Sequence, residues 1–321
     1  MATAEQIKAL VRSIKDNDEE RFYNIALQVA SSASKKGQSR YASDLKTLID
    51  KGRDSYKRRG EPSKIAEPKG ELADIMYAAY PEQRLSDVML PNGLDSKVKR
   101  IILEQRQRQK LYSHSLRPKS KILLAGESGT GKTLTASMLA SELQIPLFVI
   151  KFEGLISKYL GETAAKLRMI FDQMHEKRGV YLFDEFDAVG TQRSNNNDVG
   201  EARRIVSSLL QFIEQDDSDS LIVAATNHKG ALDEALFRRF DDILTFEKPD
   251  KTTIKAFINN IITLHGDVSF DIQWEDVIDN ALDLSFAEIE LSIKSAIKLS
   301  ILKETKRVDS MMIAEELKQR K

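Results

Sequence analysis

A glycine-rich loop that directly follows an apolar run constrains this chain more than any other feature of its sequence. The run covers residues 121–125 and is predicted to be a strand. Glycines allow backbone N–H groups to turn toward phosphate oxygens, and a helix that begins after them presents its positive end to the same anion. The sequence therefore predicts a phosphate-binding P-loop, made of Gly126, Glu127, Ser128, Gly129, Thr130, Gly131, Lys132 and Thr133.

A second apolar run, residues 180–183, ends in the paired carboxylates of Asp184 and Glu185. In P-loop chemistry the lysine, here Lys132, neutralises charge on the β- and γ-phosphates. Thr133 and Asp184 are the expected Mg²⁺ ligands, and Glu185 can polarise the water that attacks the γ-phosphate. Together the two features predict a magnesium-dependent nucleoside triphosphatase.

The composition excludes several other classes. A chain of 321 residues is long enough for a large α/β domain with smaller helical domains. It has no cysteine, which excludes disulfides, thiol catalysis and cysteine-bound zinc and fits a cytoplasmic location. Its four histidines lack the spacing of paired metal ligands. We expect neither a transmembrane helix nor a signal peptide, because the apolar runs have only strand length and the N-terminus lacks a basic and an apolar region.

The first 50 residues are predicted to form a small helical domain that selects substrates or docks a partner. Residues 3–6 have the pattern of a capping box, and apolar residues follow at helical spacing. Residues 51–84 are basic and contain several glycines and prolines, which indicates a linker. The apolar positions expected to face inward are Ile7, Leu10, Val11, Ile14, Phe22, Ile25, Ala26, Val29, Tyr41, Leu45, Leu48 and Ile49.

Residues 85–248 are predicted to form the large α/β domain. We expect helix from 72 to 109 with a break at 87–95, and then a regular alternation of strands with helices, which is typical of a parallel sheet. The strands are expected near 121–125, 147–152, 180–184, 221–226 and 243–246. Beyond Pro249 only helices are expected, so residues 249–321 are predicted to be an all-helical domain, with helices near 252–264, 274–282, 286–303 and 310–319.

Three further polar residues narrow the class of P-loop protein. Asn227 follows the strand at 221–226, where an asparagine can sense the γ-phosphate and orient the attacking water. Arg238 and Arg239 stand just before the strand at 243–246, far from Lys132 in the sequence. Arginines in this position are consistent with arginine fingers, which contact the nucleotide bound to a neighbouring subunit.

From about Leu85 to the C-terminus the chain resembles the AAA clade of the AAA+ ATPases. In that family residues 126–133 match the Walker A motif and residues 183–187 the Walker B motif. Asn227 matches sensor 1, and Arg238 and Arg239 match the arginine fingers. The resemblance implies ATP as the nucleotide, a P-loop AAA+ domain with a helical lid, and a homo-oligomeric ring, expected to be a hexamer.

The resemblance also implies a loop that contacts substrate in the centre of the ring. Lys158, Tyr159 and Leu160, followed by Gly161, match the aromatic, aliphatic, glycine pattern of a pore loop. The alternative is that Tyr159 packs in the core. A second candidate loop at residues 194–200 lacks apolar residues and can equally be a plain turn.

Two nucleotide contacts are less clear in the sequence. By resemblance residues 86–90 lie where the adenine rests, with Asp87 and Val88 as the contacting residues. The lid departs from the family pattern, because residues 284–288 read Leu-Ser-Phe-Ala-Glu where a small glycine-containing turn is usual. Contacts from the lid to the nucleotide are therefore not predicted.

These features favour an ATPase that remodels, unfolds or translocates protein substrates. Stand-alone bacterial AAA ATPases of similar layout imply a possible partner, a separately encoded subtilisin-like protease. One alternative is a nucleic-acid ATPase such as a loader, although lysine plus arginine and aspartate plus glutamate both number 49. Another is an assembly switch controlled by ATP. The candidate basic face of the nucleic-acid alternative is Lys97, Lys99, Arg100, Arg106, Arg108 and Lys110.

Overall fold

A computed structural model describes residues 25–27, 29–30, 46–47, 49, 67–91, 93–155, 160–185, 196–227, 237–266 and 268–321. The chain divides into two compact units, Met1–Ile65 and Ala66–Lys321. In the first unit the described residues are helical, and Ala26, Ala30 and Ile49 form a small apolar cluster. Val29 is buried as well and Ile25 is half-buried, whereas the predicted inward positions before residue 25, together with Tyr41, Leu45 and Leu48, lie outside the described residues.

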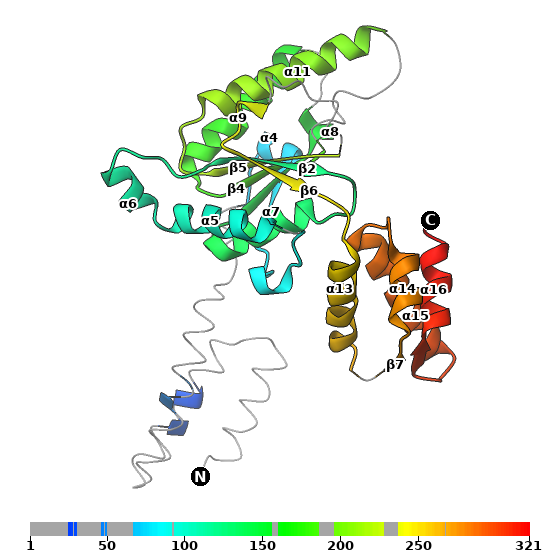
Figure 1. Ribbon diagram of the computed structural model, residues 1–321. Coiled ribbons are helices and arrows are strands. Elements are labelled where there is room, and N and C mark those ends of the chain that lie inside the picture. The colour runs from blue at the N-terminus through cyan, green and yellow to red at the C-terminus, as the bar shows by residue number, and fades with distance from the viewer. Residues whose placement is uncertain are drawn as a thin grey trace. The chain divides into compact units, whose positions relative to one another are not determined.

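A six-stranded sheet forms the centre of the second unit (Figure 1). The strand order is β1-β3-β4-β5-β2-β6, in which β1 is antiparallel to β3 and the other neighbours are parallel. This order brings the end of β2 next to the end of β5, with β4 beyond it. The strands are β1 (Met76–Ala79), β2 (Lys121–Gly126), β3 (Leu147–Ile150), β4 (Val180–Phe183), β5 (Leu221–Thr226) and β6 (Asp242–Phe246).

Helices cover both faces of this sheet (Figure 1), which explains why its central strands are apolar throughout. Leu123 faces one layer, whereas Ile122 and Leu124 face the other, because side chains alternate along a strand. One layer contains α4 (Glu71–Ile75), α8 (Phe152–Leu155), α9 (Leu160–Glu176) and α11 (Asn196–Gln215). The opposite layer contains α5 (Leu94–Arg106) and α7 (Lys132–Leu143); the short elements η2 (Leu85–Asp87) and α6 (Arg108–Ser113) flank α5 in the sequence.

The segment before Leu85 differs from the prediction of a helix or linker. Residues 71–75 form α4, but residues 76–79 form the edge strand β1, which pairs Met76 with Ile150 and Ala79 with Leu147. Ile75 and Met76 are fully buried against the sheet. Pairing with the free edge of β3 decides this conformation, and so short a segment carries no periodicity that could reveal it.

The C-terminal residues form the expected helical bundle, with one correction. The helices are α13 (Lys251–Leu264), α14 (Trp274–Ala281), α15 (Phe286–Leu302) and α16 (Ser310–Lys318). Two strands of three residues, β7 (Ser269–Asp271) and β8 (Arg307–Asp309), pair in parallel where only helix was predicted. Among the described helices of the whole chain, none has the length and apolar character needed to cross a membrane.

Candidate functional site

The P-loop needs glycine at three of its positions for geometric reasons. Gly129 and Gly131 have φ of 73° and 100°, in the left-handed region that side chains disfavour. A Cβ on Gly126 would lie 2.2 Å from the carbonyl oxygen of Phe246 on the neighbouring strand. Gly131 is also the N-cap of α7, so the loop leads directly into the positive end of a 12-residue helix.

Lys132 joins the P-loop to the end of β5. Its side chain is nearly buried, and Nζ donates hydrogen bonds to the carbonyl oxygens of Gly126 at 2.8 Å and Glu127 at 2.7 Å. The same ammonium donates to Oδ1 of Asn227 at 2.8 Å. The predicted phosphate-binding lysine and the predicted sensor therefore lie in direct contact.

Thr133 and Asp184 are also brought together. The Thr133 hydroxyl donates to Oδ2 of Asp184 at 2.6 Å, and the backbone N–H of Glu185 donates to Oδ1 of the same carboxylate at 3.0 Å. A hydroxyl beside a carboxylate is an oxygen donor pair of the kind Mg²⁺ takes when nucleotide phosphates and water complete its shell. The residues fit this ion, and the described residues contain no cluster of three or more acidic, histidine or cysteine side chains that would hold a metal without a nucleotide.

Glu185 occupies an unusual backbone position for a non-glycine residue. Its φ is 53°, in the left-handed region, and its side chain is exposed immediately after the buried strand β4. Such conformations cost roughly 1–3 kcal/mol and persist where the surroundings fix them, commonly at catalytic sites. The turn presents the Glu185 carboxylate at the same edge of the sheet as Lys132 and Thr133.

Arg238 and Arg239 lie at the opposite edge of the sheet. They occupy a turn between Phe237 and Phe240, closed by a hydrogen bond from the Phe240 N–H to the Phe237 carbonyl at 3.3 Å. The strand that follows, β6, runs parallel to β2, and its first residues pair with the start of β2, whereas Gly126 pairs with Phe246 at its end. The length of this pairing is roughly 13 Å at about 3.3 Å per residue. The arginines therefore lie at the end of β6 that is far from the nucleotide site of their own subunit.

Asp87, which with Val88 is a predicted adenine contact, is bonded within its own short helix η2. Oδ2 of Asp87 accepts the Arg84 N–H at 2.9 Å, and this bond, followed by that from Ser86, lowers the pKa of the Asp87 carboxyl. The Leu85 N–H donates to Oε1 of Glu142 near the C-terminal end of α7. Lys132 begins the same helix, so the contact of Leu85 lies at the helix end opposite the P-loop.

Val88 is buried in the layer that contains α5 and α7. The contact of these two residues with the adenine stays a prediction.

The predicted pore-loop residues are only partly described. Lys158 and Tyr159 lie outside the described residues. Leu160 and Gly161 are the first residues of α9. Asn196 to Gly200 of the second candidate loop form the beginning of α11 instead of a turn.

The comparisons with known proteins agree with this arrangement. Residues 122–248 match the model of the ATPase family associated with various cellular activities (AAA). An uncharacterised AAA family ATPase of Sinorhizobium fredii, y4kL, is 34% identical over 313 residues, which cover 96% of this chain and 92% of that protein. This chain belongs to the AAA family of ATPases. It therefore binds and hydrolyses ATP, as the P-loop and the carboxylate pair predicted.

Other relatives of this AAA ATPase are longer proteins. The peroxisomal ATPase PEX6 of Candida glabrata is 34% identical over 219 residues, which cover 65% of this chain and 21% of PEX6. The 26S proteasome regulatory subunit 4 homolog of Saccharomyces cerevisiae is 32% identical over 253 residues, or 75% of this chain and 56% of the subunit. A crystal structure of the FIGL-1 AAA domain matches the fold with a TM-score of 0.61 and 23% identity, over 81% of this chain and 92% of that domain.

The lid of this AAA ATPase touches the P-loop although it lacks the usual glycine turn. The Ala287 N–H donates to the carbonyl of Gly129 at 3.1 Å, and Ser285 Oγ would lie 2.6 Å from a Cβ on Gly129. Ser285 caps α15 in a capping box with Glu288, and the Ser285 backbone N–H lowers the pKa of the Glu288 carboxyl. Sequence reasoning missed this contact, for which the pattern Ser-x-x-Glu at 285–288 was the available signal.

A second link between the P-loop and the lid side runs through Lys248, which follows β6. Its Nζ lies 2.9 Å from Oε2 of Glu127, and this hydrogen bond raises the pKa of Lys248. Glu288 and Asp283 of the lid add to the negative potential around the same ammonium. A charged P-loop residue is thereby tied to the junction with the helical lid.

The basic face proposed for nucleic-acid binding is largely compensated by carboxylates. Five of its six basic side chains lie within ion-pair distance of an acidic residue, so the surface of α5 and its surroundings carries mixed charge. This argues against a phosphate-binding stripe. The pairs are Lys97 with Asp242, Lys99 with Asp95, Arg100 with Glu104, Arg106 with Glu142 and Arg108 with Asp219.

Proposed function

We propose that this AAA ATPase forms a ring, expected to be a hexamer, that uses Mg-ATP hydrolysis to unfold or translocate protein substrates through its centre. The observation that carries the proposal is the position of Arg238 and Arg239 at the sheet edge opposite Lys132. Arginine fingers so placed serve a neighbouring copy, so that each nucleotide site is completed by the next subunit. The names of its relatives, among them a proteasome regulatory subunit, support a polypeptide as the substrate.

In this mechanism the residues at the C-terminal ends of the parallel strands have separate roles. The P-loop N–H groups and Lys132 bind the phosphates, and Asn227 orients the attacking water from the end of β5. Glu185 accepts a proton from that water. When bound, Mg²⁺ at Thr133 and Asp184 neutralises charge on the phosphates. An arginine from the neighbouring subunit stabilises the charge that develops in the transition state.

Substrate contact is assigned to Lys158, Tyr159 and Leu160. An aromatic ring can insert between the side chains of an extended polypeptide without selecting one sequence, and a nearby lysine adds a charge that interacts with the backbone. The N-terminal domain, residues 1–50, would select the substrate or dock a partner. Degradation, if coupled, would belong to a separate subtilisin-like protease in the cytoplasm, since the chain carries no protease motif.

The ring is tested by mixing two inactive variants. Arg239→Ala lacks a finger, whereas Lys132→Ala lacks a functional P-loop but keeps its fingers. If fingers act in trans, mixed rings regain ATPase activity at the sites formed by an Arg239→Ala P-loop and a Lys132→Ala finger. Activity no greater than that of the two variants measured separately would contradict the proposal.

Protein remodelling is tested at Tyr159. The Glu185→Gln variant is crosslinked in its native cell with ATP present, and the polypeptide recovered, absent from a Lys132→Ala control, becomes the probe. We expect Tyr159→Ala to keep its basal ATPase activity but to lose unfolding of that probe, whereas Tyr159→Phe retains it. Recovery of DNA or RNA, or equal unfolding by Tyr159→Ala, would overturn the assignment.

A further inference from the structure

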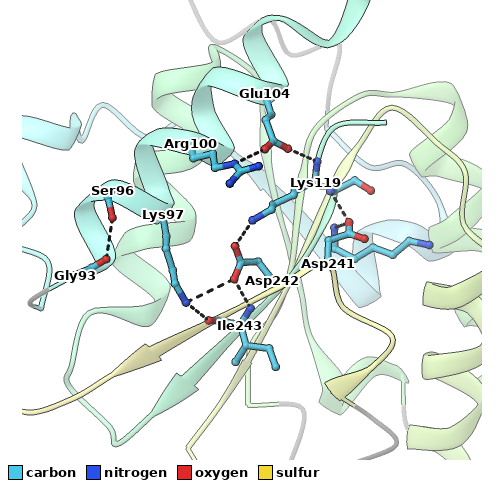
Figure 2. Close-up of polar contacts among 11 residues, drawn as sticks. Gly93, Ser96, Lys97, Arg100, Glu104, Lys119, Asp241, Asp242 and Ile243 are labelled. Carbon is cyan, nitrogen blue, oxygen red and sulfur yellow. Dashed lines mark hydrogen bonds and ion pairs between the residues drawn. The ribbon is translucent and has the colours of Figure 1, made fainter. Parts of the chain in front are cut away.

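Asp241, two residues after Arg239, is bonded to the start of β2 by three hydrogen bonds. Its carboxylate Oδ2 accepts the backbone N–H groups of Ser120 at 2.8 Å and Lys121 at 2.9 Å (Figure 2). Its own N–H donates to the Lys121 carbonyl at 2.8 Å. A carboxylate that accepts two backbone donors fixes both the position and the direction of the chain at this point.

The next residue continues the same attachment. Asp242 accepts a hydrogen bond from Lys119 Nζ at 2.5 Å and lies 3.8 Å from Lys97 Nζ on α5 (Figure 2). The Lys119 N–H in turn donates to Oε2 of Glu104. The beginning of β6 is therefore held between the start of β2 and helix α5, as the converging dashed lines in Figure 2 show.

The arginine turn is held on its other side as well. Nε of Arg239 lies 3.4 Å from Oε2 of Glu214, in the last turn of α11. Lys121 Nζ donates to the carbonyl of the same Glu214 at 3.1 Å. Phe240 is buried in the core beneath the turn. Lys121 thus bonds to both residues that hold the turn in place. Its backbone bonds to Asp241, and its ammonium bonds to the carbonyl of Glu214.

We propose that Asp241 is a positioning residue for the arginine fingers Arg238 and Arg239. Its side chain bonds to backbone groups of its own subunit. Asp241 therefore acts on the reaction indirectly, by fixing the position of the turn that carries the two arginines. The inference rests on the proposed function, because it requires that the fingers serve a neighbouring subunit. It predicts a defect that appears only in the nucleotide site of the neighbour.

This prediction separates positioning from a general role in folding. A misfolded Asp241→Ala subunit would lose its own nucleotide site together with its fingers. A subunit with displaced fingers keeps its own P-loop intact, since Lys132 and Gly126 lie at the other end of β2. The second kind of subunit can be rescued by a neighbour that supplies well-placed arginines.

The experiment measures ATPase activity in mixtures with Lys132→Ala, together with nucleotide affinity from a fluorescent ATP analogue. We expect Asp241→Ala alone to lose about 100-fold in kcat, the scale seen when a catalytic group is misplaced by about 1 Å, while its nucleotide affinity stays within about twofold. Mixing with Lys132→Ala should restore activity as it does for Arg239→Ala. Asp241→Asn, which keeps a side-chain oxygen for the two N–H groups, should retain part of the activity.

Asp276→Ala is the matched control, because Asp276 is an exposed residue of α14 in the C-terminal helical lid, and this variant should behave as the wild type. Rescue of Arg239→Ala without rescue of Asp241→Ala would overturn the inference and leave the proposed function standing. Wild-type kcat in Asp241→Ala, or a large loss of its own nucleotide affinity, would also overturn it. Failure of both rescues would remove the proposed function and the inference together.

Discussion

The Thr133 hydroxyl donates a 2.6 Å hydrogen bond to Oδ2 of Asp184, across 51 positions of the sequence. The two residues follow β2 and β4, which are not neighbours, because β5 lies between them. The contact therefore connects the P-loop helix to the strand end that carries Glu185. It places the two predicted Mg²⁺ ligands side by side. Removal of the Thr133 hydroxyl should therefore change the Mg²⁺ requirement of the ATPase.

We predict that Thr133→Ala raises the Mg²⁺ concentration needed for half-maximal ATPase activity by about tenfold, because removal of one oxygen ligand costs on the order of 1.4 kcal/mol. Thr133→Ser is the matched control and should stay within about twofold of the wild type, since it keeps the hydroxyl. A magnesium titration of phosphate release measures both. Equal magnesium requirements for Ala and Ser would exclude Thr133 as a ligand.

Glu185→Gln is expected to keep ATP binding and to lose turnover by about 100-fold or more, because the amide cannot accept the proton of the attacking water. Single-turnover phosphate release gives the rate, and a fluorescent ATP analogue gives the affinity. Normal turnover in this variant would mean that another group activates the water.

Gly126→Ala should both weaken nucleotide binding and destabilise the fold. The added Cβ would lie 2.2 Å from the Phe246 carbonyl oxygen and 2.7 Å from its Cβ, so β6 or the loop must move. We expect a loss of about 1–3 kcal/mol in the free energy of unfolding, the usual range for overpacking. Urea unfolding measures this change.

Gly266→Ala is the control for that substitution, because no atom lies within 4 Å of its added Cβ. It should change the free energy of unfolding by no more than about 0.5 kcal/mol. Equal stability losses in the two variants would show that the close approach of Gly126 to Phe246 is not the cause.

Much of this architecture was predictable from the sequence, for physical reasons. The buried parallel strands are continuous apolar runs that end in the polar residues of the site, so both their positions and their common edge could be inferred. The lid helices also follow their patterns closely: α13 was predicted at 252–264 and spans Lys251–Leu264. Asp184, Glu185 and Asn227 could be grouped because each directly follows a strand.

The remaining features depend on partners distant in the sequence. β1, β7 and β8 contain only three or four residues each, and pairing alone makes them strands. The lid contacts the P-loop through the bond of Ala287 to Gly129, and Asp241 contacts β2 through the backbone of Ser120 and Lys121. Because these bonds are made to backbone groups, the residue type of the partner does not reveal them. The adenine contacts expected of Asp87 and Val88 stay a prediction, because the bonds of that segment lead to Glu142.

Asp242 should contribute an acid-sensitive part of the stability. Burial alone raises the pKa of its carboxyl, but the hydrogen bond and charge of Lys119, with the charge of Lys97, outweigh this and hold the pKa below its usual value. A carboxyl whose pKa is lowered by folding stabilises the fold fully above the unfolded pKa of about 3.9, and the contribution is lost as pH falls through the folded pKa.

Asp242→Asn is therefore expected to lower the free energy of unfolding by about 1–2 kcal/mol at pH 7, between the values typical of exposed and buried ion pairs. The difference from the wild type should shrink below about pH 4. Urea unfolding between pH 3 and pH 7, with Asp217→Asn as an exposed control, measures both effects. A difference that is constant over this range would contradict the ion pair as its source.

The edge strand β1 sets a practical limit on how far the chain can be shortened. Besides its ladder with β3, the Lys151 N–H donates to the Ile75 carbonyl at 2.8 Å, and Gly154 packs against the backbone of Asp74. A chain that began at Leu85 would leave the outer edge of β3 open, and an open edge is a template for pairing with another copy. Aggregation of such a fragment would then be explained by the loss of the edge strand β1. A fragment designed to contain the soluble ATPase domain should therefore begin no later than Gly70.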